Sequence, residues 1–137
     1  MDFVKVVYSD VLPSLPEDEK WALSSQLRRS SQSIPSNIAE GYGRYYYQET
    51  IRFCYIARGS LEEAFTKMKL ANDLGYLPDE KWEKMNDLVK EMHRMLNGYV
   101  AFLKRSKRGE NEPGSRSTLR ESMPIYDDFP DEPNPDP

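Results

Sequence analysis

Residues 41–47 contain one arginine among four tyrosines and two glycines, in the order Gly-Tyr-Gly-Arg-Tyr-Tyr-Tyr. Aromatic rings that stack on bases, beside arginines that contact phosphates, are a common way to bind single-stranded RNA or DNA. Arg44 and Tyr45 are therefore candidate nucleic-acid-binding residues. The alternative is that Tyr45, Tyr46 and Tyr47 take the place of a polar helix cap and pack on a neighbouring subunit.

More candidate phosphate-binding residues follow on two predicted helices: Arg52, Arg58, Lys104, Arg105, Lys107 and Arg108. The last four end a helix, where cations also suit the negative end of the helix dipole, so they are weak evidence for a partner. Residues 1–108 carry 17 Lys and Arg against 15 Asp and Glu, a net charge of +2. Residues 109–137 carry 2 against 8, net −6, which together give −4. The predicted folded part is therefore slightly basic.

Residue types that carry catalysis or bind metals are scarce in this chain. His93 is the only histidine, and Lys90 precedes it by three residues, so the Glu-x-x-His pairs of a di-iron bundle are missing. There is no nucleophile elbow, Walker glycine loop or zinc-type cysteine spacing. Cys54 is the only cysteine, and on an apolar helical stripe we expect it to be a small buried hydrophobe. The sequence predicts no enzyme, no cofactor and no metal site.

The central element is a predicted helix that starts near Pro16, with Ser14 as its cap and Glu17 completing a capping box, and runs to about Tyr42, where Gly41 and Gly43 end it. Its apolar residues recur at helical spacing: Leu23, Leu27, Ile34 and Ile38. Pro35 interrupts this helix and removes the amide that would bond the Ser31 carbonyl, at a cost of roughly 3 kcal/mol. We expect a kink in which a water or a nearby hydroxyl serves that carbonyl, from Ser30, Ser31 or Ser33.

Three other helices are predicted from periodicity. The first has about eleven residues and ends at Pro13, the third runs from about Tyr46 to Leu74, and the fourth begins near Asp79. The fourth has a wide apolar stripe: Trp82, Met85, Val89, Met92, Leu96, Tyr99 and Leu103, with Leu88, Met95 and Phe102 beside them. This width predicts a helix that faces a bundle interior and leaves room for contact with a second subunit.

The predicted helix lengths do not match. The first helix spans roughly 16 Å, whereas the other three, of about 26 to 29 residues, span roughly 40 Å each at 1.5 Å per residue. A bundle built from them leaves apolar surface uncovered. Two explanations stay open, either that Met1 lies inside a longer ancestral helix or that a neighbouring subunit covers the gap.

Several motifs resemble the small bacterial four-helix bundle proteins named for intervening sequences in 23S ribosomal RNA genes. They are Gln-Leu-Arg-Arg (26–29), Ser-Ile-Pro-Ser-Asn-Ile-Ala-Glu-Gly (33–41), Gly-Arg (43–44), Ile-Arg-Phe (51–53), Gly-Ser-Leu-Glu (59–62) and Leu-Gly-Tyr-Leu (74–77). The resemblance covers about residues 1–107. It implies a homo-oligomer, with a pentameric ring as the known arrangement, and no settled activity. A related bundle, the accessory variability determinant of diversity-generating retroelements, engages a reverse transcriptase and its RNA.

The resemblance also marks a set of signature residues: Arg28, Arg29, Ile34, Pro35, Asn37, Glu40 and Gly41. We expect a structural role for them, with the arginines bonded to Glu40 or Glu63, ahead of the alternative that they form a ligand or nucleic-acid surface.

The sequence therefore predicts an all-α, up-down-up-down four-helix bundle over residues 1–108, with a short first helix. Residues 109–137 are acidic and proline-rich, which predicts a disordered tail. No stretch can span a membrane or serve as a signal peptide, so we expect a cytoplasmic protein. The predicted function is a non-catalytic oligomeric protein that binds RNA or a reverse transcriptase. The alternative is a purely structural or regulatory homo-oligomer without nucleic-acid contact.

Overall fold

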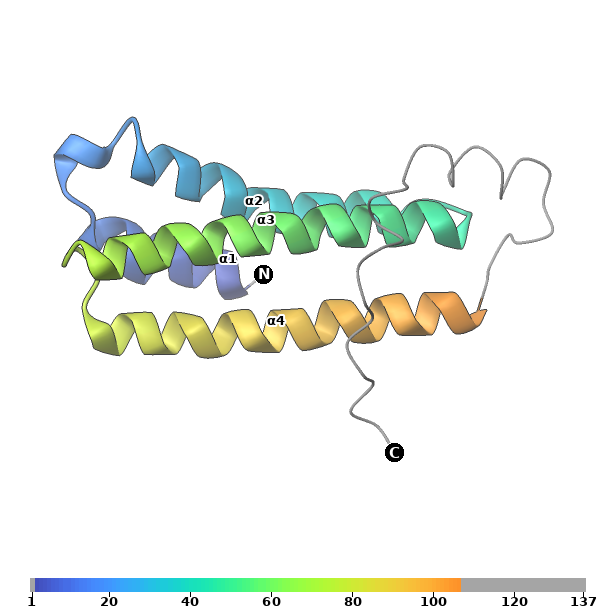
Figure 1. The fold of residues 1–137 in the computed structure, drawn as a ribbon. Helices are drawn as coiled ribbons and strands as arrows, with labels where there is room; N and C mark the ends of the chain where they lie inside the picture. Colours follow the sequence, from blue (N-terminus) through green and yellow to red (C-terminus); the bar gives the residue numbers. More distant parts are fainter. Residues whose placement is uncertain (1, 107–137) are drawn as a thin grey trace.

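The computed structural model describes residues 2–106, which form four helical segments in up-down-up-down order with no strand among them (Figure 1). The first segment joins α1 (Asp2–Val6), a π-helical turn η1 (Val7–Val11) and a 3-10 turn η2 (Leu12–Ser14). After a 3-10 turn η3 (Glu17–Glu19) come three long helices: α2 (Leu23–Tyr42), α3 (Tyr47–Asp73) and α4 (Asp79–Ser106). The predicted all-α bundle is confirmed. The predicted tail, with Lys107 and Arg108, lies outside the described residues.

The second helix begins later than predicted. Instead of one helix from Pro16, η3 is followed by a turn, and α2 starts at Leu23, the first buried residue of its apolar stripe. The predicted capping box does not form, because η3 has no side-chain cap and the Ser14 hydroxyl donates to the Asp10 carbonyl at 3.0 Å. The carboxylate of Glu19 instead accepts the Leu23 amide at 3.2 Å, so it satisfies one of the free N–H groups at the start of α2.

The helix ends follow the sequence more closely. The first segment ends in a 3-10 turn that contains Pro13, so it stops at Ser14, one residue past the predicted stop. Gly75 has φ +81°, a conformation that favours glycine, and its amide bonds the Asn72 carbonyl just after α3. Asp79 and Glu80 lie in the first turn of α4, where negative charge suits the helix dipole.

Two clusters of buried side chains make up the core. The larger one draws residues from all four helical segments, including Phe3, Val7, Leu27, Leu61 and Met85. The smaller one lies between the start of α3 and the end of α4 and consists of Ile51, Cys54, Tyr55, Val100 and Leu103. The first helical segment contributes nothing to this second cluster, because it covers only part of the bundle length (Figure 1).

The short first segment leaves one side of α4 uncovered. Lys84, Met95 and Phe102 share that side, since 18 residues make about five turns at 3.6 residues per turn. Lys84 contacts the first segment through Asp10. Farther along, Met95 is 63% exposed and Phe102 54% exposed. The remaining residues of the predicted seam of α4 are buried or half-buried, so the exposed pair marks the expected apolar gap.

Pro35 lies inside α2, which is helical on both sides of it. The expected compensation by Ser30 and Ser31 is wrong, because their hydroxyls donate to the carbonyls of Leu27 and Arg28 at 3.3 and 3.1 Å. The Ser33 hydroxyl instead pairs with that of Ser60 at 2.8 Å and thereby joins α2 to α3 beside the proline. Small hydroxyls on this buried face allow the two helices to approach closely.

Gly41 has a different role from the predicted helix stop. It is the penultimate residue of α2, and a Cβ placed on it would lie 2.7 Å from the Cβ of Phe53 and 3.2 Å from the Thr50 carbonyl oxygen. The glycine is therefore required by the close contact between α2 and α3.

None of the helices within residues 2–106 is both long and apolar enough to cross a membrane.

Candidate nucleic-acid interface

The α2–α3 connection and the end of α4 lie at the same end of the bundle (Figure 1). This follows from the alternating directions of the helices, which bring the first turns of α3 beside the last turns of α4 through the smaller core cluster. Five of the predicted nucleic-acid-binding residues thus lie toward one end of the molecule, although they come from segments about 60 residues apart in the chain: Arg44, Tyr45, Arg52, Lys104 and Arg105.

Arg44 and Tyr45 lie in the short connection between α2 and α3. The Arg44 guanidinium is 2.5 Å from the Glu40 carboxylate and 5.2 Å from the centroid of the Phe53 ring. Its side chain is still 42% exposed. Tyr45 is 56% exposed and packs edge-on against Tyr46, with ring centroids 5.4 Å apart. Both side chains can reach a ligand, but Arg44 shares its charge with a carboxylate.

Arg52 and Arg58 differ although both are on α3. Arg52 is exposed, and its side chain has no hydrogen bond or ion pair with any residue between 2 and 106. Arg58 is half-buried, donates to the Asn97 carbonyl oxygen at 2.8 Å and lies 4.7 Å from the Tyr55 ring centroid. The geometry therefore gives Arg58 a structural role between α3 and α4, and leaves Arg52 available to a phosphate.

Lys104 and Arg105 occupy the last turn of α4, where positive charge also suits the helix dipole. Lys104 is half-buried and Arg105 is exposed. Together with Arg44 and Arg52 they place four positively charged side chains at this end of the bundle. Glu40 and Glu49 contribute two negative charges there, so the local net charge is smaller than four.

The signature residues of α2 divide into two groups. Ile34 is fully buried, and Asn37 donates to the Ser33 carbonyl at 2.8 Å, so these two hold the helix and its packing in place. Arg28 and Arg29 are exposed and do not bond Glu40 or Glu63, contrary to the expected network. Glu40 pairs instead with Arg44, four residues later in the connection between α2 and α3. The two arginines line a depression of about 620 Å³ on the outer side of α2.

The single cysteine and the single histidine of the chain are both engaged within the bundle. Cys54 is 1% exposed, which confirms the predicted buried thiol, and burial raises its pKa to about 11. His93 is half-buried, and its Nε2 contacts the Glu62 carboxylate on α3. Within residues 2–106 no three His, Cys, Asp or Glu side chains are grouped so that they could hold a metal ion.

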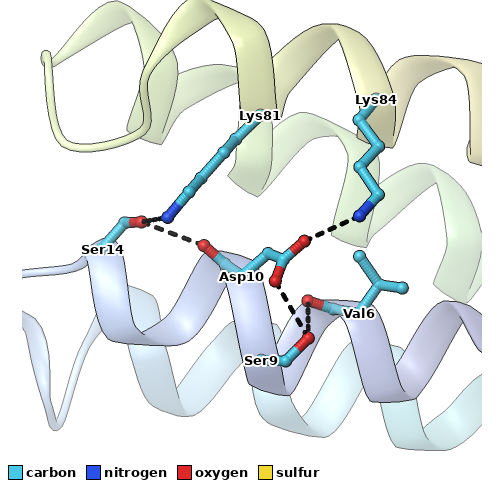
Figure 2. Close-up of polar contacts among 6 residues, drawn as sticks. All are labelled: Val6, Ser9, Asp10, Ser14, Lys81 and Lys84. Carbon is cyan, nitrogen blue, oxygen red and sulfur yellow. Dashed lines mark hydrogen bonds and ion pairs between the residues drawn. The ribbon is translucent and has the colours of Figure 1, made fainter.

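A polar contact that the periodicity analysis missed holds the first helical segment on α4 (Figure 2). Lys84 lies 2.9 Å from the Asp10 carboxylate, and Lys81 donates to the Ser14 hydroxyl at 3.2 Å. The hydrogen bonds from Lys84 and then Ser9 hold the pKa of Asp10 below its usual range. The paired residues are some 70 positions apart in the chain. From the sequence, only the opposite charges of Asp10 and Lys84 on two predicted helices could have suggested this contact.

The family model of the 23S rRNA-intervening sequence protein matches residues 1–98. The chain belongs to this family. The matched region contains the whole signature stretch of α2 and stops before Lys104, so the basic end of α4 lies beyond it. This family is not a known enzyme family. No match was found among curated proteins.

Proposed function

We propose that this family member is a non-catalytic, self-associating bundle that binds RNA at the end formed by the α2–α3 connection and the last turn of α4. The observation that carries the proposal is the convergence of exposed or half-buried cations and an exposed tyrosine from distant segments: Arg44, Tyr45, Arg52, Lys104 and Arg105. Such a surface offers charge to phosphates and a ring to bases, without the fixed donor pattern that reads a sequence.

Self-association is the second part of the proposal, with one reason to expect it and one consequence for RNA binding. The exposed side chains of Met95 and Phe102 give a monomer an apolar surface that a neighbouring subunit would cover. An oligomer would also repeat the basic end several times, so that weak contacts per subunit add up to useful affinity. A pentamer, and a reverse transcriptase as protein partner, are the forms of this proposal that the family resemblance implies. The alternative is an oligomer that buries Met95 and Phe102 between subunits but makes no contact with nucleic acid.

The test is RNA binding by the full chain, measured by fluorescence anisotropy with a labelled single-stranded oligonucleotide. We expect weak binding that falls steeply between about 50 and 200 mM salt, because bound cations release counterions from the RNA. Replacing Lys104 and Arg105 with Gln should reduce the slope of log K against log salt by about 0.7 per lost phosphate contact. Extending the change to Lys107 and Arg108 should flatten it further.

The control variant carries Lys90→Gln and Arg94→Gln. Both residues are exposed on the middle of α4. Their substitution lowers the net charge by the same amount as Lys104→Gln with Arg105→Gln. They should leave the slope unchanged. Truncation after Arg108 removes a segment of net charge −6 and should tighten binding, because the chain then repels the RNA phosphates less. If neither the full nor the truncated chain binds RNA at low salt, the structural alternative replaces this proposal.

A further inference from the structure

The depression on the outer side of α2 is a second surface of unusual chemistry. Its lining comes from residues 20–36 and includes Lys20, Trp21, Arg28 and Arg29 but no carboxylate. Trp21 is 84% exposed, the most exposed of the large hydrophobic side chains in residues 2–106. The remainder of the lining consists of hydroxyl and amide groups: Ser25, Gln32, Ser33 and Ser36.

The charges on this surface are largely uncompensated. Neither Arg28 nor Arg29 has a hydrogen bond or ion pair with another residue between 2 and 106. Lys20 lies 3.9 Å from the carboxylate of Glu17, an exposed pair of little strength, and 5.2 Å from the centroid of the Trp21 ring. The fold itself therefore makes no use of the two guanidinium groups, which remain free to pair with an anion.

The spacing fits a linear ligand. Trp21 lies in the turn just before α2, and Arg28 and Arg29 lie five and six residues after its first residue Leu23, roughly 8–9 Å along the helix at 1.5 Å per residue. A single strand of nucleic acid offers a planar base and a charged phosphate in every repeat, so it can match an indole at one point and guanidinium groups at the next. An acidic peptide supplies the charge but no planar group in every repeat.

We infer that this outer face of α2 binds single-stranded nucleic acid, with a base stacked on Trp21 and phosphates contacted by Arg28 and Arg29. The inference adds a second contact surface to the RNA binding proposed above and rests on that function for the class of ligand. It also gives these two signature arginines a binding role in place of the structural network expected from the sequence.

Trp21 provides a direct readout of binding. The chain has two tryptophans, and Trp82 is half-buried against Phe65 with ring centroids 5.2 Å apart. In the full chain carrying Trp82→Phe, the indole emission comes from Trp21 alone. We expect single-stranded oligouridine to quench this emission saturably. Arg28→Gln with Arg29→Gln should weaken the binding that the quenching reports roughly fivefold, about what two exposed ion pairs with phosphates contribute together. The Lys90→Gln, Arg94→Gln pair is the matched control and should leave the quenching unchanged.

Three results would overturn the inference. One is emission that does not respond to RNA while anisotropy shows RNA binding that depends on Lys104 and Arg105, in which case the function proposed above stands and this surface is not used. Another is equal quenching by a glutamate homopolymer, which would identify an acidic peptide as the ligand. The third is emission that shifts with protein concentration alone, which would show that Trp21 lies in a contact between subunits. If Trp82→Phe does not fold, anisotropy with Trp21→Ala and with the arginine variant on the wild-type background decides the same question.

Quenching that survives in the Lys104→Gln, Arg105→Gln variant would support the α2 surface. If the salt dependence of RNA binding in that variant is also unchanged, the interface at the bundle end is rejected while the α2 surface stands. The failures of the two proposals are thus distinguishable within one set of proteins.

Discussion

The Nζ of Lys84 lies 2.9 Å from the Oδ2 of Asp10 and joins α4 to the first helical segment across 74 positions of the chain (Figure 2). The Asp10 side chain is 31% exposed and that of Lys84 55% exposed, so water and salt weaken the pair. The pair helps to fix the position of the first segment on α4, because that segment is short and makes few other polar contacts with α4.

Asp10→Asn should reduce stability at neutral pH and have no such effect in acid. The pKa of Asp10 is lowered in the folded chain, so its contribution is full above the unfolded pKa of about 3.9 and disappears as the pH falls through the lower folded value. Urea unfolding at several pH values measures this difference from wild type. Asp18→Asn is the control, since Asp18 is exposed and has no ion pair within residues 2–106. A destabilisation that persists at pH about 2 would contradict the assignment.

Gly41→Ala should destabilise the bundle by about 1–3 kcal/mol, the usual cost of overpacking. The added Cβ would lie 2.7 Å from the Phe53 Cβ, which is fixed to the backbone and cannot swing away. Gly59→Ala is the control, because a Cβ at that position in α3 meets nothing within 4 Å. It should stabilise by about 0.5–1 kcal/mol through lower backbone entropy in the unfolded chain. Thermal unfolding of both variants separates the two effects, and a Gly41→Ala protein as stable as wild type would show that α2 and α3 are not tightly packed.

Cys54 should resist thiol reagents in the folded protein. It is 1% exposed and burial raises its pKa to about 11, so both access and thiolate are lacking at neutral pH. Labelling with iodoacetamide should therefore follow the unfolded fraction as urea is added. Because the folded pKa exceeds the unfolded value of about 8.5, stability is unaffected below that pH and declines as the pH rises toward 11. Cys54→Ala should lack that part of the decline.

Met95→Gln with Phe102→Gln should shift the protein toward the monomer. These side chains are 63% and 54% exposed on the side of α4 that the first segment does not reach. Light scattering should show a wild-type mass above the 16.0 kDa of one chain and a lower mass for the variant. Leu70→Gln with Leu74→Gln is the control, since that pair is similarly exposed at the other end of the bundle. A wild-type protein that is a monodisperse monomer at micromolar concentration would refute self-association.

The sequence alone determined the helices and most of the buried face of each. The spacing of Leu23, Leu27 and Ile34, and the seam from Met85 to Leu103, place apolar groups on one side of a helix whatever its neighbours are. The buried state of Cys54 and the helix end at Gly75 followed for the same local reason. Local patterns also indicated that the first segment is too short to cover the bundle.

Only the tertiary structure decided the partners of the polar groups. Arg58 bonds Asn97, Glu40 bonds Arg44 rather than Arg28 or Arg29, and Lys84 bonds Asp10. These choices depend on the rotation of each helix about its axis and on the register between antiparallel neighbours, which periodicity does not specify. A long charged side chain can reach several carboxylates at similar energy, so the geometry of the assembled bundle selects among them.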